Sequence, residues 1–112
     1  KGGKKHGWGV AFTYGDRYEG QWRDGFQHGK GTLTFSGGDR LEGTFEGGEA
    51  EGPGVTRFAN GDTFYGRYKQ GRMHGQGLLV ERGGVQWEET WENGKRAAVR
   101  KLEEGLPLPD AN

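Results

Sequence analysis

An internal repeat of 23 residues is the feature that most constrains what this chain can fold into. Four segments at that spacing begin with a large apolar residue, at Tyr18, Leu41, Phe64 and Trp87. Every segment has an aromatic residue at its fifth position, at Trp22, Phe45, Tyr68 and Trp91. A fixed period of about 20–50 residues is the signature of a repeat architecture, in which each unit packs on its neighbours.

Glycine recurs within the unit. The third position carries Gly20, Gly43 and Gly66, and Glu89 breaks this column in the last segment. Positions one, three and five share one face of an extended strand, because side chains alternate sides along it. We therefore expect the glycine to leave room for a neighbouring ring to lie across the backbone.

Turn signals divide each unit into a hairpin and a connection to the next. The first turn falls at Asp24-Gly25, Gly47-Gly48, Gln70-Gly71 and Asn93-Gly94, and the second at Ser36–Asp39, Ala59–Asp62 and Arg82–Gly84. Asp-Gly, Gly-Gly and Asn-Gly are strong hairpin signals, because they accept positive φ. A second strand is expected after each Gly-x-Gly, over Thr32–Phe35, Val55–Phe58 and Leu78–Val80. The sequence predicts an all-β fold: an elongated, twisted antiparallel meander of about seven or eight short strands.

The expected organisation is a repeat array over residues 1–94 and a different C-terminal segment. The array divides into a partial repeat 3–17, repeats 18–40, 41–63 and 64–86, and a partial repeat 87–94. Because the opening stretch matches only the back half of a unit, we interpret the chain as a piece of a longer array or multidomain protein. Lys95–Glu104 is rich in helix formers and is followed by Gly105, so residues 95–112 are expected to form a short C-terminal helix and a tail.

Composition argues against several classes of function. Sixteen basic and 16 acidic residues balance, so the chain lacks the net positive field on which nucleic-acid binding depends. There is no cysteine, no apolar run long enough to span a bilayer and no signal-peptide pattern. These features favour a cytoplasmic location, with the periphery of a membrane or of the cytoskeleton left open.

Neither a metal site nor a catalytic site is expected. His6, His28 and His74 share one repeat column. Strands lie about 4.8 Å apart, so His28 and His74 are about 20 Å apart and each is expected to brace its own turn. The Gly-x-Gly motifs lead into strands, whereas a phosphate loop leads into a helix. The carboxylates occupy repeat or turn positions, and Asp39 and Asp62 are expected to cap their local backbone. We expect no catalysis and no cofactor.

The columns resemble the MORN (membrane occupation and recognition nexus) repeat family. The pattern aromatic-Glu-Gly-x-aromatic followed by Gly and His-Gly-x-Gly stands at Tyr18–Trp22 with Gly25, His28, Gly29 and Gly31. It recurs at Phe64–Tyr68 with Gly71, His74, Gly75 and Gly77. The second unit departs from it at Glu51 and Pro53, and the fourth at Glu89. The resemblance implies a scaffold that binds an extended or helical segment of another protein along a groove, and that sometimes associates with membranes or with itself.

Three functional hypotheses follow. The first is a protein-interaction module that uses the aromatic residues, both as core and as contact surface: Trp8, Tyr18, Trp22, Phe45, Phe64, Tyr68, Trp87 and Trp91. The second is a tether to acidic phospholipid, including phosphoinositide, through the terminal cations Lys4, Lys5, Arg96, Arg100 and Lys101. The third is self-association, as in a homodimer, through exposed sheet edges.

Overall fold

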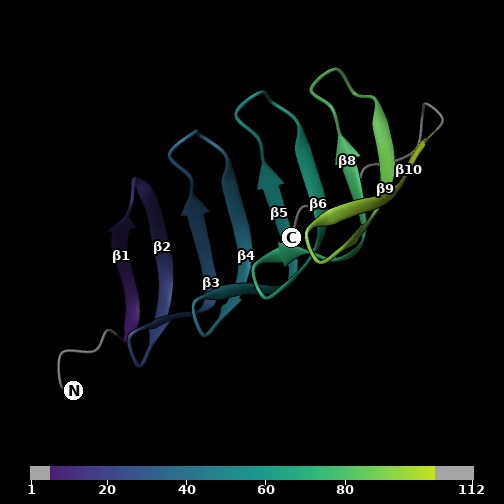
Figure 1. Ribbon diagram of the computed structural model, residues 1–112. Coiled ribbons are helices and arrows are strands. Elements are labelled where there is room, and N and C mark those ends of the chain that lie inside the picture. Colours follow the sequence, from purple (N-terminus) through teal and green to yellow (C-terminus); the bar gives the residue numbers. More distant parts are fainter. Residues whose placement is uncertain (1–5, 103–112) are drawn as a thin grey trace.

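The computed structural model describes residues 6–102 and consists of one antiparallel sheet (Figure 1). Its strands are β1 (Gly7–Thr13), β2 (Asp16–Arg23), β3 (Phe26–Thr34), β4 (Arg40–Glu46), β5 (Glu49–Arg57), β6 (Thr63–Lys69), β7 (Arg72–Met73), β8 (Gly75–Val80), β9 (Gln86–Glu92) and β10 (Lys95–Lys101). They pair in chain order, except that the short β7 lies off this path and pairs with β6. The radius of gyration is 15.1 Å, against about 13 Å for a compact chain of 100 residues, so the molecule is elongated. The predicted all-β meander of hairpin repeats is confirmed, with ten strands in place of seven or eight.

The hairpin turns have the positive φ angles that their sequences predict. Asp24 and Gly25 have φ of 51° and 84°, and the pairs Gln70-Gly71 and Asn93-Gly94 are also both positive. Positive φ at both central residues defines the type I′ turn, whose twist matches that of the flanking strands. These turns therefore fix the register of each hairpin.

The Gly-x-Gly motif lies inside the second strand, which corrects the expectation that this strand begins after it. β3 and β5 begin directly after the turn and run through the motif. Gly20 pairs with Gly31 while Trp22 pairs with Gln27, so β3 contains two extra residues at this point. Gly29, with φ of 68°, sits in this irregularity, because a bulge places its extra residue in a left-handed conformation that glycine adopts without strain. In the third unit the same irregularity separates β7 from β8 at His74.

The hydrophobic core lies on one side of the sheet, the core face, which carries the residues at positions one and five of each unit. Tyr18, Leu41, Phe45, Ala50, Phe64 and Tyr68 are 1–6% exposed. A Cβ on Gly20 or Gly31 would overlap the Tyr18 side chain, and one on Gly66 or Gly77 would overlap the Phe64 ring. The glycines are therefore required because rings lie directly on the backbone, as the sequence predicts.

Ring packing alternates from one unit to the next. In the first and third units the ring at position one covers the paired glycines, and the position-five ring of the next unit meets it edge-on: Tyr18 contacts Phe45 at 5.0 Å between centroids, and Phe64 contacts Trp91 at 6.2 Å. Leu41 is too short for this role. Gly54 is instead approached by the Tyr68 ring, whose Cε1 would lie 3.1 Å from an added Cβ. The first and third units therefore pack alike, and the second differs from both.

Hydrogen bonds at the second turn join successive units, which corrects the expectation of local capping by aspartate. The Asp39 carboxylate accepts a hydrogen bond from the Ala59 N–H at 2.8 Å, and Asp62 accepts one from the Arg82 N–H at 2.9 Å. Asp16 holds the Ser36 N–H in the same way at 2.9 Å. Each aspartate thus fixes the turn of the following unit.

The histidine column joins units at the opposite end of the hairpins, and for His6 and His74 the expectation that each braces its own turn is wrong. His6 Nδ1 accepts from the Asp24 N–H at 3.4 Å, and His74 Nδ1 accepts from the Asn93 N–H at 3.3 Å. Glu51, which replaces histidine in its unit, accepts from the Gln70 N–H at 2.6 Å. These acceptors lie beside the next turn because consecutive hairpins stack in the sheet.

The segment predicted to form a C-terminal helix is a strand over residues 95–101, and the rest of that prediction falls outside the described residues. β10 pairs with β9 after the Asn93-Gly94 turn, and its register shifts between Arg96 and Ala98. Helix propensity is a weak preference that tertiary context overrides. Here the type I′ turn directs the chain back along the open edge of β9, where its backbone groups find partners.

Replacing Gly31 with alanine tests the approach of ring to backbone. The added Cβ would overlap the buried Tyr18 ring, so Gly31→Ala should lower the free energy of unfolding by about 1–3 kcal/mol, as overpacking does. Gly37→Ala is the control, because a Cβ at Gly37 meets nothing within 4 Å. Urea unfolding followed by tryptophan fluorescence measures both, and equal stabilities of the two variants would contradict the ring-on-backbone account.

Alkaline pH should destabilise the core. Burial raises the pKa of the Tyr68 phenol above its ordinary value of 10.0. The folded state then holds this proton more tightly than the unfolded state, so the free energy of unfolding falls as pH rises above about 10. Urea unfolding across this range should show a shallower fall for Tyr68→Phe than for the unsubstituted protein. Parallel curves would rule out this contribution.

Candidate interaction groove

The side of the sheet opposite the core face is called the groove face. It carries the side chains of residues that alternate with the core-face residues along each strand. In β5 and β6 these are Pro53, Val55, Tyr65 and Arg67, and the register pairs Val55 with Tyr65 and Pro53 with Arg67. Gly31, Gly43, Gly54 and Gly66 lie between such residues along the strands and present backbone atoms on this face.

A groove of about 530 Å³ lies on this face. This volume is within the range of small-ligand pockets, about 300–1,000 Å³. The backbone of glycines at the third position and in the Gly-x-Gly motifs forms its base, and other side chains line it: Trp8, Lys30, Thr32, Glu42, Thr44, Pro53, Val55 and Tyr65. Most of these residues come from β3, β4, β5 and β6, so the groove runs across neighbouring hairpins.

Tyr65 interrupts a column of ion-paired carboxylates on the groove face. Position two of the other units is glutamate, and each is held by arginine: Glu19 by Arg17 at 3.0 Å, Glu42 by Arg57 at 3.7 Å, and Glu88 by Arg100 at 2.9 Å. Tyr65 instead pairs across the strands with Val55 on one side and Leu78 on the other. The groove face therefore has an apolar band at this unit where the others present charge.

The eight aromatic residues predicted as a contact surface fall into different environments. Trp8, 63% exposed, is the one of them that lines the groove. Four are buried on the core face, at Tyr18, Phe45, Phe64 and Tyr68, and Trp22, Trp87 and Trp91 are half-buried there. In this conformation the four buried rings are available to the core and not to a partner.

Sequence reasoning missed most of the groove residues because it followed the repeat columns. The residue at position two and the middle residue of each Gly-x-Gly motif are neighbours of the column residues along a strand. Side chains alternate between the two faces of a strand, so these residues lie on the opposite face. Tyr65 could have been found as the single non-acidic residue in the position-two column of Glu19, Glu42 and Glu88.

The cations predicted to meet lipid are partly engaged. Arg96 and Arg100 bind Glu89 and Glu88 at 3.2 and 2.9 Å, and Lys101 lies beside them on β10. Lys4 and Lys5 fall outside the described residues. Within residues 6–102 no three histidine, aspartate or glutamate side chains lie together as metal ligands would, and no helix there could cross a membrane.

The MORN repeat pattern matches residues 18–40, 42–63 and 64–80, more than half of the chain. This chain belongs to the MORN repeat family. Comparison with individually curated proteins gives no match. MORN repeats are non-catalytic modules that interact with proteins or membranes.

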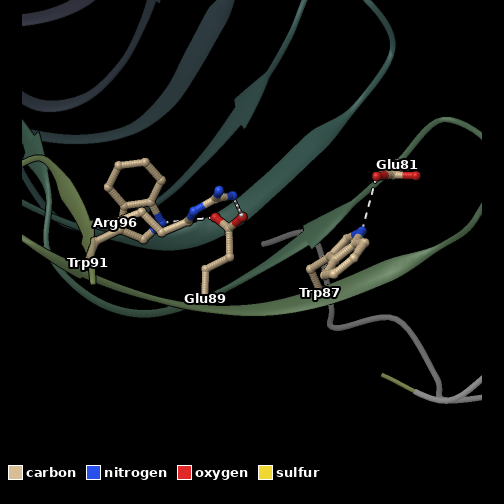
Figure 2. Close-up of polar contacts among 5 residues, drawn as sticks. All are labelled: Glu81, Trp87, Glu89, Trp91 and Arg96. Atoms are coloured by element: carbon tan, nitrogen blue, oxygen red, sulfur yellow. Dashed lines mark hydrogen bonds and ion pairs between the residues drawn. The ribbon is translucent and has the colours of Figure 1, made fainter. Parts of the chain in front are cut away.

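Glu89 marks the end of the regular MORN packing. It occupies the glycine column yet is 3% exposed, and its carboxylate accepts hydrogen bonds from Trp91 Nε1 at 2.9 Å and Arg96 Nη1 at 3.2 Å. Figure 2 shows why it fits: Trp87 directs its indole to Glu81, at 3.0 Å, away from the space in which Glu89 meets Arg96. The ring that would exclude a side chain in an ordinary MORN unit is thus turned aside.

Two arginines on β10 allow a matched test of this arrangement. Arg96→Ala leaves the Glu89 carboxylate buried with one donor fewer, so the free energy of unfolding should fall by about 1–3 kcal/mol. Arg100→Ala removes the partner of the more exposed Glu88, and should cost about 0.2–1 kcal/mol. Urea unfolding measures the pair. Equal losses of unfolding free energy in the two variants would mean that burial of Glu89 does not make its ion pair more important for stability.

Proposed function

We propose that this MORN array is a non-catalytic scaffold that holds a segment of a partner protein, helical or extended, in the groove across β3–β6. The observation that carries the proposal is the apolar band of Val55, Tyr65 and Leu78, which stands where the other units carry an ion-paired glutamate at position two. Aromatic side chains in a well-packed depression are the usual centres of binding energy in protein interfaces. A hydrophobic side chain of the partner would seat on this band.

Charged groups beside the apolar band would orient a bound partner segment. The Glu42 carboxylate at the groove is already held by Arg40 at 3.9 Å and Arg57 at 3.7 Å. The Lys30 ammonium, also at the groove, has no ion-pair partner among the side chains of residues 6–102. A partner segment with a carboxylate next to its apolar residue would suit this groove, because Lys30 would gain an ion-pair partner and the two arginines already offset the charge of Glu42.

Tyr65→Glu is the substitution that separates binding from folding. Glutamate stands at this column in the other units, so the fold should tolerate it, while a charge in the apolar band should weaken binding about tenfold or more. Peptides selected from a random display library against the unsubstituted array serve as probes, and their affinities are measured by isothermal titration calorimetry.

Tyr14→Glu is the matched control, because Tyr14 is 99% exposed and lies outside the groove. Selected peptides should bind it as they bind the unsubstituted protein. Peptides that lose no affinity with Tyr65→Glu would contradict the proposal. Vesicles with and without phosphoinositide form a second arm: lipid-dependent binding that persists in Tyr65→Glu and falls with salt would assign the interaction to a membrane.

A further inference from the structure

Positive charge is concentrated on the groove face between β3 and β6, although the whole chain has 16 basic and 16 acidic residues. The register aligns three rows of groove-face residues across these strands, beginning at Thr34, Thr32 and Lys30 on β3. Four cations stand in these rows against one carboxylate, that of Glu42: Lys30, Arg40, Arg57 and Arg67. The groove therefore has an excess of positive charge that the composition of the chain does not reveal.

The neighbouring strands do not share this excess. In the same rows on β2, Arg17 binds Glu19 at 3.0 Å, and across β9 and β10 Arg100 binds Glu88 at 2.9 Å. The other residues that the register places in these rows on β2, β8 and β9 are uncharged. The unbalanced charge is thus confined to the strands that form the groove.

Two of the four cations face each other across the strands. Arg40 and Arg57 are directly opposite in the register of β4 and β5, an arrangement in which like charges destabilise a sheet. They share the Glu42 carboxylate, at 3.9 and 3.7 Å, which is longer than a hydrogen bond of about 2.7–3.2 Å. One carboxylate balances one guanidinium, so this pair lacks a second anion. The planar fork of arginine matches the geometry of a carboxylate.

The other two cations lie on the opposite side of the apolar band. Lys30 and Arg67 stand two residues along their strands from the row of Val55 and Tyr65, which is about 7 Å at the rise of a β-strand. Both side chains are exposed, and neither has an ion-pair partner among residues 6–102. Arg57 lies two residues from Val55 in the other direction, so cations border the band on both sides.

We propose that the partner segment is acidic and carries carboxylates on both borders of its apolar contact face. This inference rests on the proposed function of the groove and names the chemistry of its occupant. One carboxylate would bind between Arg40 and Arg57, and another would bind Lys30 or Arg67. The apolar residue between them would seat on Tyr65. The cost of opposing two arginines would then be recovered when the partner binds.

A protein segment fits this charge distribution better than an acidic membrane does. Lys30 and Glu42 line a groove of about 530 Å³, which a narrow segment enters. A bilayer would instead contact a wide area of a chain whose charges balance. Exposed charges farther apart than about 8–10 Å are largely screened at physiological salt, so only a ligand seated in the groove meets the local excess.

Neutralising single cations tests the proposal on peptides selected from a random display library against the unsubstituted array. These peptides should carry carboxylates beside apolar residues. Arg57→Gln and Lys30→Gln should each weaken their binding about three- to fivefold, the effect of one solvent-exposed ion pair. Arg82→Gln is the matched control, because Arg82 is exposed in the turn between β8 and β9, outside the groove, and its affinity should be unchanged. Isothermal titration calorimetry measures all three.

The stability of Arg57→Gln separates a binding role from a structural one. This variant removes the opposition of like charges and leaves Arg40 to bind Glu42, so urea unfolding should show no loss of stability relative to the unsubstituted protein. A marked loss would mean that the arginine pair serves the fold, and would overturn the proposal.

A double-mutant cycle locates the first carboxylate. Replacing each acidic residue of a selected peptide by its amide should identify one replacement whose effect disappears in Arg57→Gln, because the two changes remove the same interaction. Additive effects for every acidic residue of the peptide would contradict binding at the arginine pair.

Failure of this inference can be distinguished from failure of the proposed function. Tyr65→Gln removes the ring without changing the charge. Peptides that lose affinity with Tyr65→Gln but not with Arg57→Gln or Lys30→Gln would overturn the acidic partner and leave the groove standing as a binding site. Peptides that are indifferent to Tyr65→Gln would count against the groove itself. Vesicles of phosphatidylserine and phosphatidylcholine that bind the array and are released by Arg57→Gln, with no acidic peptide selected, would assign these cations to a membrane and overturn the proposal.

Discussion

The contact of aromatic ring with glycine backbone is the interaction on which the rest of this structure depends. A single sheet has no second layer to bury its apolar side, so rings such as Tyr18 and Phe64 must supply the core from within the sheet. They do so by lying on paired glycines, which brings side chain and backbone closer than any other residue would permit. Four of the glycines, Gly31, Gly43, Gly54 and Gly66, also line the groove on the opposite face with their backbone.

The sequence predicted the parts of the fold that depend on local rules. The 23-residue period, the type I′ turns and the need for glycine between large residues could all be predicted, because each depends on residues close together in the chain. The roles of Asp39 and His74 could not, since their hydrogen-bond partners lie 20 and 19 residues away in the next hairpin. The strand at Lys95–Lys101 was missed for a similar reason: its residues favour a helix, and the open edge of β9 decides otherwise.

The candidate site was harder to predict than the fold. Prediction from the sequence relied on the residues that recur in every unit. In this protein those residues form the core, so they do not identify the binding surface. Tyr65 contributes to the groove by departing from its column, where Glu19, Glu42 and Glu88 form ion pairs. Glu89 is a second departure, and it closes the regular packing with a buried carboxylate held by Arg96 and Trp91. In this array, the features specific to a single unit come from residues that depart from their repeat column.

The alternation of ring packing has a consequence for how such arrays change length in evolution. Tyr18 meets Phe45 as Phe64 meets Trp91, 46 residues later, while in the unit of Leu41 the Tyr68 ring of the following unit approaches Gly54. Duplication or loss of a single unit would set two covering rings, or none, at one junction. Duplication of two units together would reproduce every junction unchanged. From Tyr18 to Phe64, the unit that preserves every ring contact is therefore a pair of hairpins.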